Sequence, residues 1–146
     1  MKIEIISTVS EELEAAFLRL LPQLSETMLV PNRSELEEII SCPTTTLFVA
    51  RDDGPQNEII GVLTLAVFRS PAGMNALIED VVVDKRARGK GAGEALTRAA
   101  ITLAAEKGAK RVDLTSALWR DAANHLYQKL GFSLWDTNFY RYIIKK

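Results

Sequence analysis

Several features are scarce in this chain of 146 residues, and each absence argues against a class of protein. A single cysteine, Cys42, rules out an internal disulfide framework and a cysteine-based zinc site, so we expect no metal. No apolar run approaches the roughly 18 residues of a membrane span. Lysine plus arginine (18) nearly cancel aspartate plus glutamate (19), so we expect neither a nucleic-acid nor a membrane partner. The first residues, MKIEIISTVS, lack the apolar centre of a secretory signal, and we expect a cytoplasmic protein.

The residues that are present are sufficient for one hydrophobic core. The chain is 47% hydrophobic, which fits a single domain over residues 1–146 and leaves no length for a separate substrate domain. The apolar spacing alternates between strand and helix periods, which predicts an α/β chain. The strands are expected at 2–6, 46–51, 59–68, 77–83 and 111–115, followed by a terminal pair at 132–135 and 138–144. The helices are expected after a capping box formed by Thr8 and Glu11, and at 34–40, 93–107 and 120–130.

The segment VVVDKRARGKGAGEALTRAA, residues 81–100, carries the clearest functional signal. A buried strand runs into a basic, glycine-rich turn, and the turn runs directly into a helix. Backbone N–H groups and the positive end of the helix dipole therefore converge at one point. Glycines at 89, 91 and 93 let the backbone approach an oxyanion without a Cβ, and Arg88 and Lys90 add positive charge. The pattern favours a phosphate ligand, best a pyrophosphate.

Two common nucleotide-binding motifs do not fit this turn. A dinucleotide fingerprint requires G-x-G-x-x-G, but Gly93 follows Gly91 one place too early. A P-loop requires a Gly-Lys pair followed by serine or threonine, which the turn does not contain. A nucleotide-binding oxidoreductase stays open as an alternative, because Asp113 lies about twenty residues past the glycines, where such enzymes place a ribose-binding acid. Against it, Asp113 lies inside a predicted strand and not at its end.

Two motifs together resemble the GNAT superfamily of N-acetyltransferases, and in particular its small bacterial members. The run Arg88-x-x-Gly91-x-Gly93, after the strand VVV and before a helix, is similar to the coenzyme A signature of that family. Downstream, NHLYQKLGF at 124–132 is similar to the family segment N-x-x-Y-x-x-x-G-F. The resemblance covers about residues 63–142.

The resemblance implies the GNAT-type acyl-CoA N-acyltransferase fold. This is an α/β (α+β) fold in which a mostly antiparallel sheet splays between strands four and five and is flanked by about four helices. Acetyl-CoA, as cosubstrate, would place its pantetheine arm in that splay and its pyrophosphate on the glycine turn. The coenzyme-binding residues implied are Val81, Val82 and Val83 for the arm, Arg88, Gly89, Lys90, Gly91, Ala92 and Gly93 for the pyrophosphate, and Asn124 for the arm from the following helix.

Direct attack of an amine on acetyl-CoA in a ternary complex requires two proton movements. An amine with a reference pKa of about 10.4 is almost fully protonated at pH 7, so a base or a desolvating site has to free it. Strand alternation puts Glu79 on one face with residues 81 and 83 and Asp80 on the other, which makes Glu79 the first candidate base. Asp80 or a water remains open. Tyr127 matches the position at which the family has a proton donor for the departing thiolate.

The same motifs also fit a catalytically idle acetyl-CoA binding module. Such a module would keep the glycine turn and lose the proton groups, although Tyr127 and Glu79 are both present. The acceptor is expected to be a small-molecule or peptide amine near residues 28–34 and 136–140, by resemblance. Several acceptors, acyl groups and oligomeric states stay open at this point, and a homodimer is among the assemblies considered.

Overall fold

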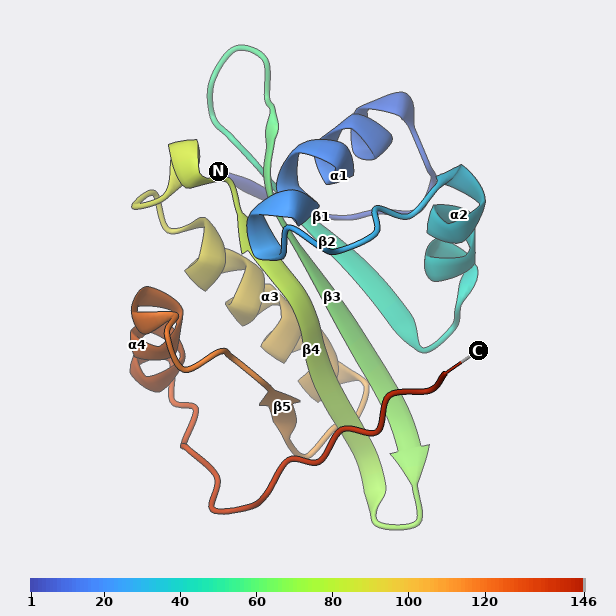
Figure 1. Cartoon of the computed structure of the whole chain (residues 1–146), viewed down its shortest axis with the longest axis vertical. Coiled ribbons are helices and arrows are strands. Elements are labelled where there is room, and N and C mark those ends of the chain that lie inside the picture. The colour runs from blue at the N-terminus through green and yellow to red at the C-terminus, as the bar shows by residue number, and fades with distance from the viewer. Residues whose placement is uncertain (146) are drawn as a thin grey trace. The chain divides into compact units, whose positions relative to one another are not determined.

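The computed structural model describes residues 1–145 and has a mixed α/β architecture (Figure 1). This confirms the expected fold class. Contacts divide the chain into two units, Met1–Thr115 and Ser116–Lys146, which are described separately. None of the helices described is long and apolar enough to cross a bilayer. The elements in chain order are β1 Lys2–Ile5, α1 Glu11–Leu24, α2 Arg33–Ser41, β2 Thr45–Arg51, β3 Ile59–Ser70, β4 Gly73–Val83, the 3-10 turn η1 Lys85–Ala87, α3 Ala92–Glu106, β5 Val112–Leu114 and α4 Asp121–Lys129.

The sheet of the first unit has the strand order β1-β2-β3-β4-β5. Neighbouring strands are antiparallel from β1 to β4, whereas β5 pairs parallel with β4 over Ala76–Ile78 only. Beyond Ile78, no strand within residues 1–145 pairs with 80–83 of β4 on the β5 side. The pairing between strands four and five therefore ends at Ile78, before the end of β4.

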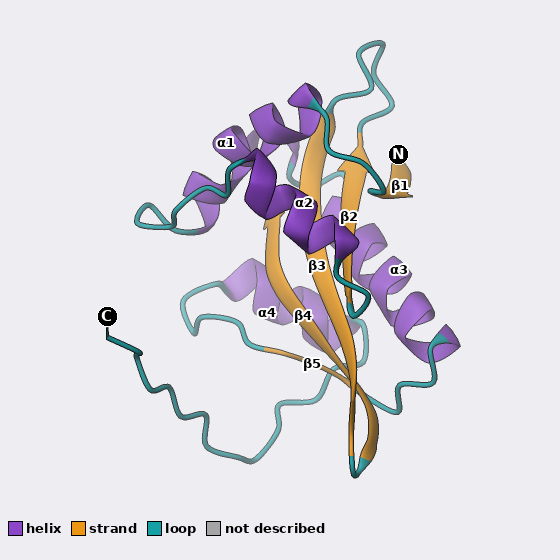
Figure 2. Cartoon of the chain, turned by 90° about the vertical axis from the view of Figure 1, so that its right-hand side faces the viewer, coloured by secondary structure: helices purple, strands orange, loops and turns teal. Residues whose placement is uncertain are grey.

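Helices cover both faces of this sheet (Figure 2). On one face α1 and α2 lie over the middle strands, and α1 buries Leu13, Phe17 and Leu20 against them. On the other face α3 buries a stripe of small and aliphatic side chains at helical spacing: Leu96, Ala100 and Ala104. Full burial of a leucine side chain stabilises by roughly 1.5–3 kcal/mol. The sheet is therefore packed on both faces, and this fixes the position of the connection between β4 and α3.

The starts of the first two helices differ from the sequence-based expectation. The N-cap of α1 is Ser10, whose hydroxyl accepts from the Leu13 amide at 3.1 Å, so the predicted capping box of Thr8 and Glu11 is wrong. The second helix has a true capping box, formed by Asn32 and Glu35. Several polar residues precede each helix, and only the one whose backbone is extended at the helix start can cap it. At the end of α3 the prediction is confirmed, because Gly108 follows the C-cap with a left-handed φ of 87°.

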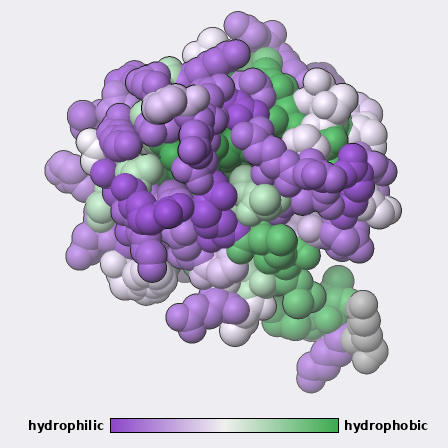
Figure 3. All heavy atoms as spheres, turned by 90° about the horizontal axis from the view of Figure 1, so that it is seen from above, coloured by the Kyte–Doolittle hydropathy of each residue, from purple (hydrophilic) through white to green (hydrophobic). Residues whose placement is uncertain are grey.

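The predicted strand pair at 132–135 and 138–144 is wrong. Residues 132–145 form no strand, and the backbone bond from the Thr137 amide to the Trp135 carbonyl is local. Aromatic and β-branched residues favour a strand only when a neighbouring strand completes the ladder, and an isolated hairpin is marginal in water. The space-filling view shows a mostly polar surface with hydrophobic side chains exposed in several places (Figure 3). The large exposed hydrophobic residues of this stretch are Leu134, Trp135, Phe139, Tyr140, Tyr142, Ile143 and Ile144.

Candidate active site

A β-bulge interrupts β4 where the catalytic carboxylates were predicted. Glu79 pairs with Thr64 and Val82 with Val62, so two residues of β4, Asp80 and Val81, lie opposite Leu63. Asp80 has a left-handed φ of 51°, which is uncommon for a residue with a side chain and is tolerated best by aspartate and asparagine. Such a backbone is often found next to functional sites. The bulge therefore marks this stretch of β4 as a candidate for binding or catalysis.

The bulge also corrects the predicted alternation of β4. From Glu79 to Val83 the chain advances four places, but its partners Thr64 and Gly61 are only three apart. Glu79 therefore lies on the same face as Val82, which packs in the core with α1. Val83 lies on the opposite face, toward Leu96 of α3. The expectation that residues 79, 81 and 83 share one face is wrong, because an extra residue reverses the side-chain alternation.

The predicted phosphate turn lies at the junction of η1 and α3. Arg88, Gly89 and Lys90 are exposed, and Ala92 is buried as the first residue of α3. Gly89 and Gly91 both have left-handed backbones, with φ of 85° and 87°, and a Cβ at either position would meet nothing within 4 Å. Gly91 is the N-cap of α3 and supplies no side-chain cap to its first amides. The turn thus brings uncapped helix amides and an accessible backbone together, which suits a phosphate oxyanion.

The turn is held from beneath by Asp84, a residue that the sequence analysis did not single out. Its carboxylate is buried and accepts hydrogen bonds from Arg19 and Gln23 of α1 and from Arg86 of η1. The sequence feature that could have identified Asp84 is its position, directly after a buried strand and before a short turn, where a capping residue is usually found. Its contacts with α1 are long-range, and no local pattern predicts them.

The second unit carries Asn124 and Tyr127 on α4. Asn124 donates its side-chain amide to the Ala117 carbonyl at 3.0 Å and so ties the start of α4 to the preceding loop. Tyr127 packs edge-on against Phe132, with ring centroids 5.7 Å apart. Burial raises the pKa of the Tyr127 phenol, against an opposing effect of Arg120. A raised pKa keeps the phenol protonated at neutral pH, which is the state that a proton donor requires.

A glycine turn thus leads from the end of β4 into α3, next to the stretch of β4 that lies beyond the β5 ladder. The sequence matches the acetyltransferase (GNAT) family over residues 11–132, and the chain belongs to that family. Mycothiol acetyltransferase of Renibacterium salmoninarum is 35% identical over 119 residues, which are 80% of this chain and 34% of that protein. The chain therefore spans about a third of the length of this curated relative.

Solved structures show the same fold. An aminoglycoside acetyltransferase from an uncultured soil metagenomic sample superposes with a TM-score of 0.81 at 23% identity, covering 99% of this chain and 96% of that one. An acetyltransferase of Trypanosoma brucei gives a TM-score of 0.76 at 26% identity, with 97% and 99% covered. Family membership sets aside the oxidoreductase alternative. Consistent with this, Asp113 lies within β5 and pairs with Arg111 at 3.3 Å.

Proposed function

We propose that this chain transfers an acetyl group from acetyl-CoA to an amine by direct attack in a ternary complex. The observation that carries this proposal is the glycine turn at the end of β4. Two left-handed glycines with open space at their Cβ positions precede a helix whose N-cap offers no side-chain bond. A diphosphate fits such a site because backbone amides and the helix dipole supply positive charge without a bulky side chain.

Residues of β4 in the first unit and of α4 in the second unit supply the remaining parts of the proposal. Backbone groups of Val81–Val83 would bind the pantetheine arm, since the β5 ladder ends before them. Glu79, exposed on β4, would accept the amine proton directly or through a water. Tyr127 would protonate the departing thiolate. Each of these assignments predicts a different kinetic signature.

The proposed activity is tested by measuring thiol release from acetyl-CoA in the presence of a panel of amines. The panel contains amino acids, polyamines, amino-sugar antibiotics and peptides with a free N-terminus. We expect at least one acceptor to accelerate thiol release above the rate with acetyl-CoA alone, with the acetylated amine as product. Tight acetyl-CoA binding without transfer to any amine would instead favour the idle binding module.

Replacement of Glu79 by glutamine should flatten the ascending limb of the pH–rate profile. A general base works only when ionised, so the wild-type rate rises with pH until the base has lost its proton, and the glutamine variant loses that rise. We expect the rate to fall about 100-fold or more on the plateau of the profile, where the wild-type base is fully ionised and its effect is largest, and to fall less at low pH, where the base is already protonated. The measurement is kcat/KM for the amine as a function of pH.

Asp80→Asn is the matched comparison for this prediction. Asparagine tolerates a left-handed backbone as well as aspartate does, so the bulge should persist while the charge is lost. If the pH–rate profile is unchanged in Glu79→Gln but flattened in Asp80→Asn, then Asp80 is the general base. If the profile is unchanged in both variants, no side-chain base is needed, and the amine loses its proton to a water or is bound already neutral in a desolvating site.

A further inference from the structure

One buried carboxylate lies directly between β4 and the glycine turn. Asp84 is only 2% exposed, and each of its oxygens accepts from positively charged or amide donors. Arg19 Nε donates to Oδ2 at 3.3 Å, and Gln23 Nε2 donates to Oδ1 at 3.5 Å. The backbone amide of Arg86 donates to Oδ1 at 3.1 Å, and Arg86 Nη2 donates to Oδ2 at 3.2 Å. The carboxylate thus joins a helix and a turn that are distant in sequence.

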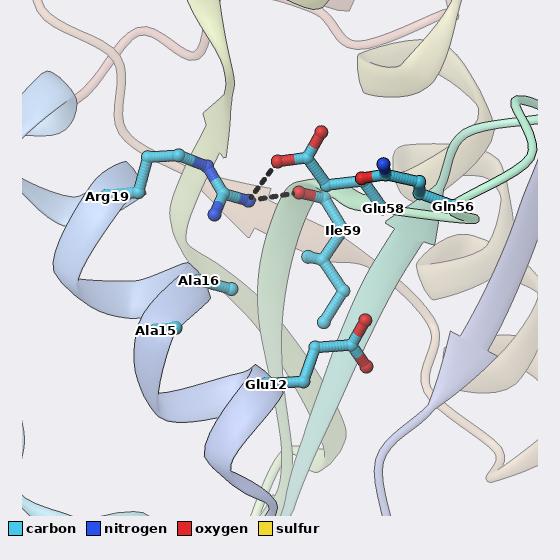
Figure 4. A pocket seen from close by; sticks show the side chains of 7 residues that line it. All are labelled: Glu12, Ala15, Ala16, Arg19, Gln56, Glu58 and Ile59. Carbon is cyan, nitrogen blue, oxygen red and sulfur yellow. Dashed lines mark hydrogen bonds and ion pairs between the residues drawn. The ribbon is translucent and has the colours of Figure 1, made fainter.

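The α1 side of this cluster is itself anchored. Arg19 and Gln23 are four residues apart and so lie on the same face of α1. Arg19 also donates to the Ile59 carbonyl and pairs with Glu58 at 3.6 Å, beside a small cavity between α1 and the start of β3 (Figure 4). Gln23 accepts the Lys85 amide through Oε1 at 2.9 Å. One side of α1 therefore holds the start of β3 and the first residue of η1.

Charge and burial make this cluster stronger than the other ion pairs near the turn. Burial would raise the pKa of Asp84, but hydrogen bonds from Arg86 and Gln23 outweigh it and lower the pKa to about 2. The carboxylate is therefore ionised at every pH at which an acetyltransferase is assayed. By contrast, the pair of Lys90 and Asp52, at 3.4 Å, has both side chains partly exposed, and such pairs contribute little. Of the two carboxylates compared, only Asp84 is buried.

We propose that Asp84 is a positioning residue for the coenzyme turn, fixing 85–87 against α1 and thereby the direction of the amides of Gly89–Gly91. The inference rests on the proposed acetyl-CoA activity, because the turn is assigned to the coenzyme pyrophosphate. Asp84 is buried beneath the turn and acts through the backbone of η1. It does not need to contact the coenzyme.

The first test is the variant Asp84→Asn in the full chain. Asparagine is close in shape and can still cap the Arg86 amide, but it removes the charge that holds Arg19 and Arg86. We expect the Kd and the KM for acetyl-CoA to rise about 10-fold, the effect of roughly one charge-assisted hydrogen bond. The kcat and the KM for the amine should stay near the wild-type values. Glu14→Gln is the matched control, because it also neutralises a carboxylate paired with an arginine, Arg33, but lies away from the turn.

A second variant keeps the test decisive if Asp84→Asn folds poorly. Gln23→Ala removes the bonds to Asp84 and to the Lys85 amide while leaving the buried charge with its arginine partners. Amide hydrogen exchange at 85–87 should accelerate in this variant, and the KM for acetyl-CoA should rise with kcat unchanged. If both variants bind acetyl-CoA like the wild type, or lose affinity only as much as Glu14→Gln does, the positioning role is refuted. If the wild-type chain binds no acetyl-CoA, the proposed function fails and this inference fails with it.

Discussion

Tyr127→Phe should lower turnover by about 100- to 10,000-fold, the usual range of general acid–base catalysis, without loss of acetyl-CoA affinity. The departing thiolate has a pKa near that of cysteine, about 8.5, so a proton donated in the transition state stabilises it. Phenylalanine keeps the ring and its edge-on packing on Phe132, and loses only the hydroxyl. A loss of this size corresponds to about 3 to 5.5 kcal/mol of barrier, more than an ordinary surface hydroxyl would contribute. The measurement is kcat with the best amine of the panel.

The control for Tyr127 is Tyr142→Phe, which removes a hydroxyl from a tyrosine of the same unit that is 91% exposed. Its turnover should match the wild type. Thermal melting and acetyl-CoA affinity are measured for both variants. Early melting or lost coenzyme binding in Tyr127→Phe would make Tyr127 a packing residue, and wild-type turnover would remove its hydroxyl from the mechanism. Because the pKa of Tyr127 is raised, the wild-type rate should not fall through loss of this proton until the pH exceeds the ordinary tyrosine range.

Gly91→Glu should abolish most of the acetyl-CoA affinity. A carboxylate about 4 Å from a phosphate is repelled by roughly 4 kcal/mol at the dielectric of a protein surface. We therefore expect the Kd to rise at least about 100-fold, which corresponds to about 2.7 kcal/mol. The left-handed backbone of Gly91 adds strain for any side chain, by roughly 1–2 kcal/mol. Isothermal calorimetry with acetyl-CoA measures the change.

Gly108→Glu separates the two contributions in this prediction. Gly108 has the same φ of 87° and lies at the opposite end of α3, so the substitution there brings the same backbone strain without a charge at the turn. We expect Gly108→Glu to melt earlier and to bind acetyl-CoA normally. If Gly91→Glu binds as well as Gly108→Glu does, the pyrophosphate site lies elsewhere.

Local patterns predicted the elements that depend on neighbours in sequence. The apolar stripe of α3 and its closing Gly108 follow from helical spacing and from the backbone freedom of glycine, and both are confirmed. The glycine turn was located from the same kind of evidence, and its left-handed glycines occupy the expected junction. The binding and catalytic roles assigned to these residues remain predictions. The predicted strands at 132–135 and 138–144 were wrong because a strand also requires a partner strand, which composition does not reveal.

Sequence by itself determined the family and the position of the turn, since both depend on residues that are close together in the chain. Only the tertiary structure decided which way Glu79 points, because the bulge at Asp80 appears when β4 is aligned with β3. The same holds for Asp84, whose partners Arg19 and Gln23 lie more than sixty positions away. Register and the pairing of buried charges are fixed by contacts between distant segments. They arise when the sheet and α1 pack together, and no short stretch of sequence records them.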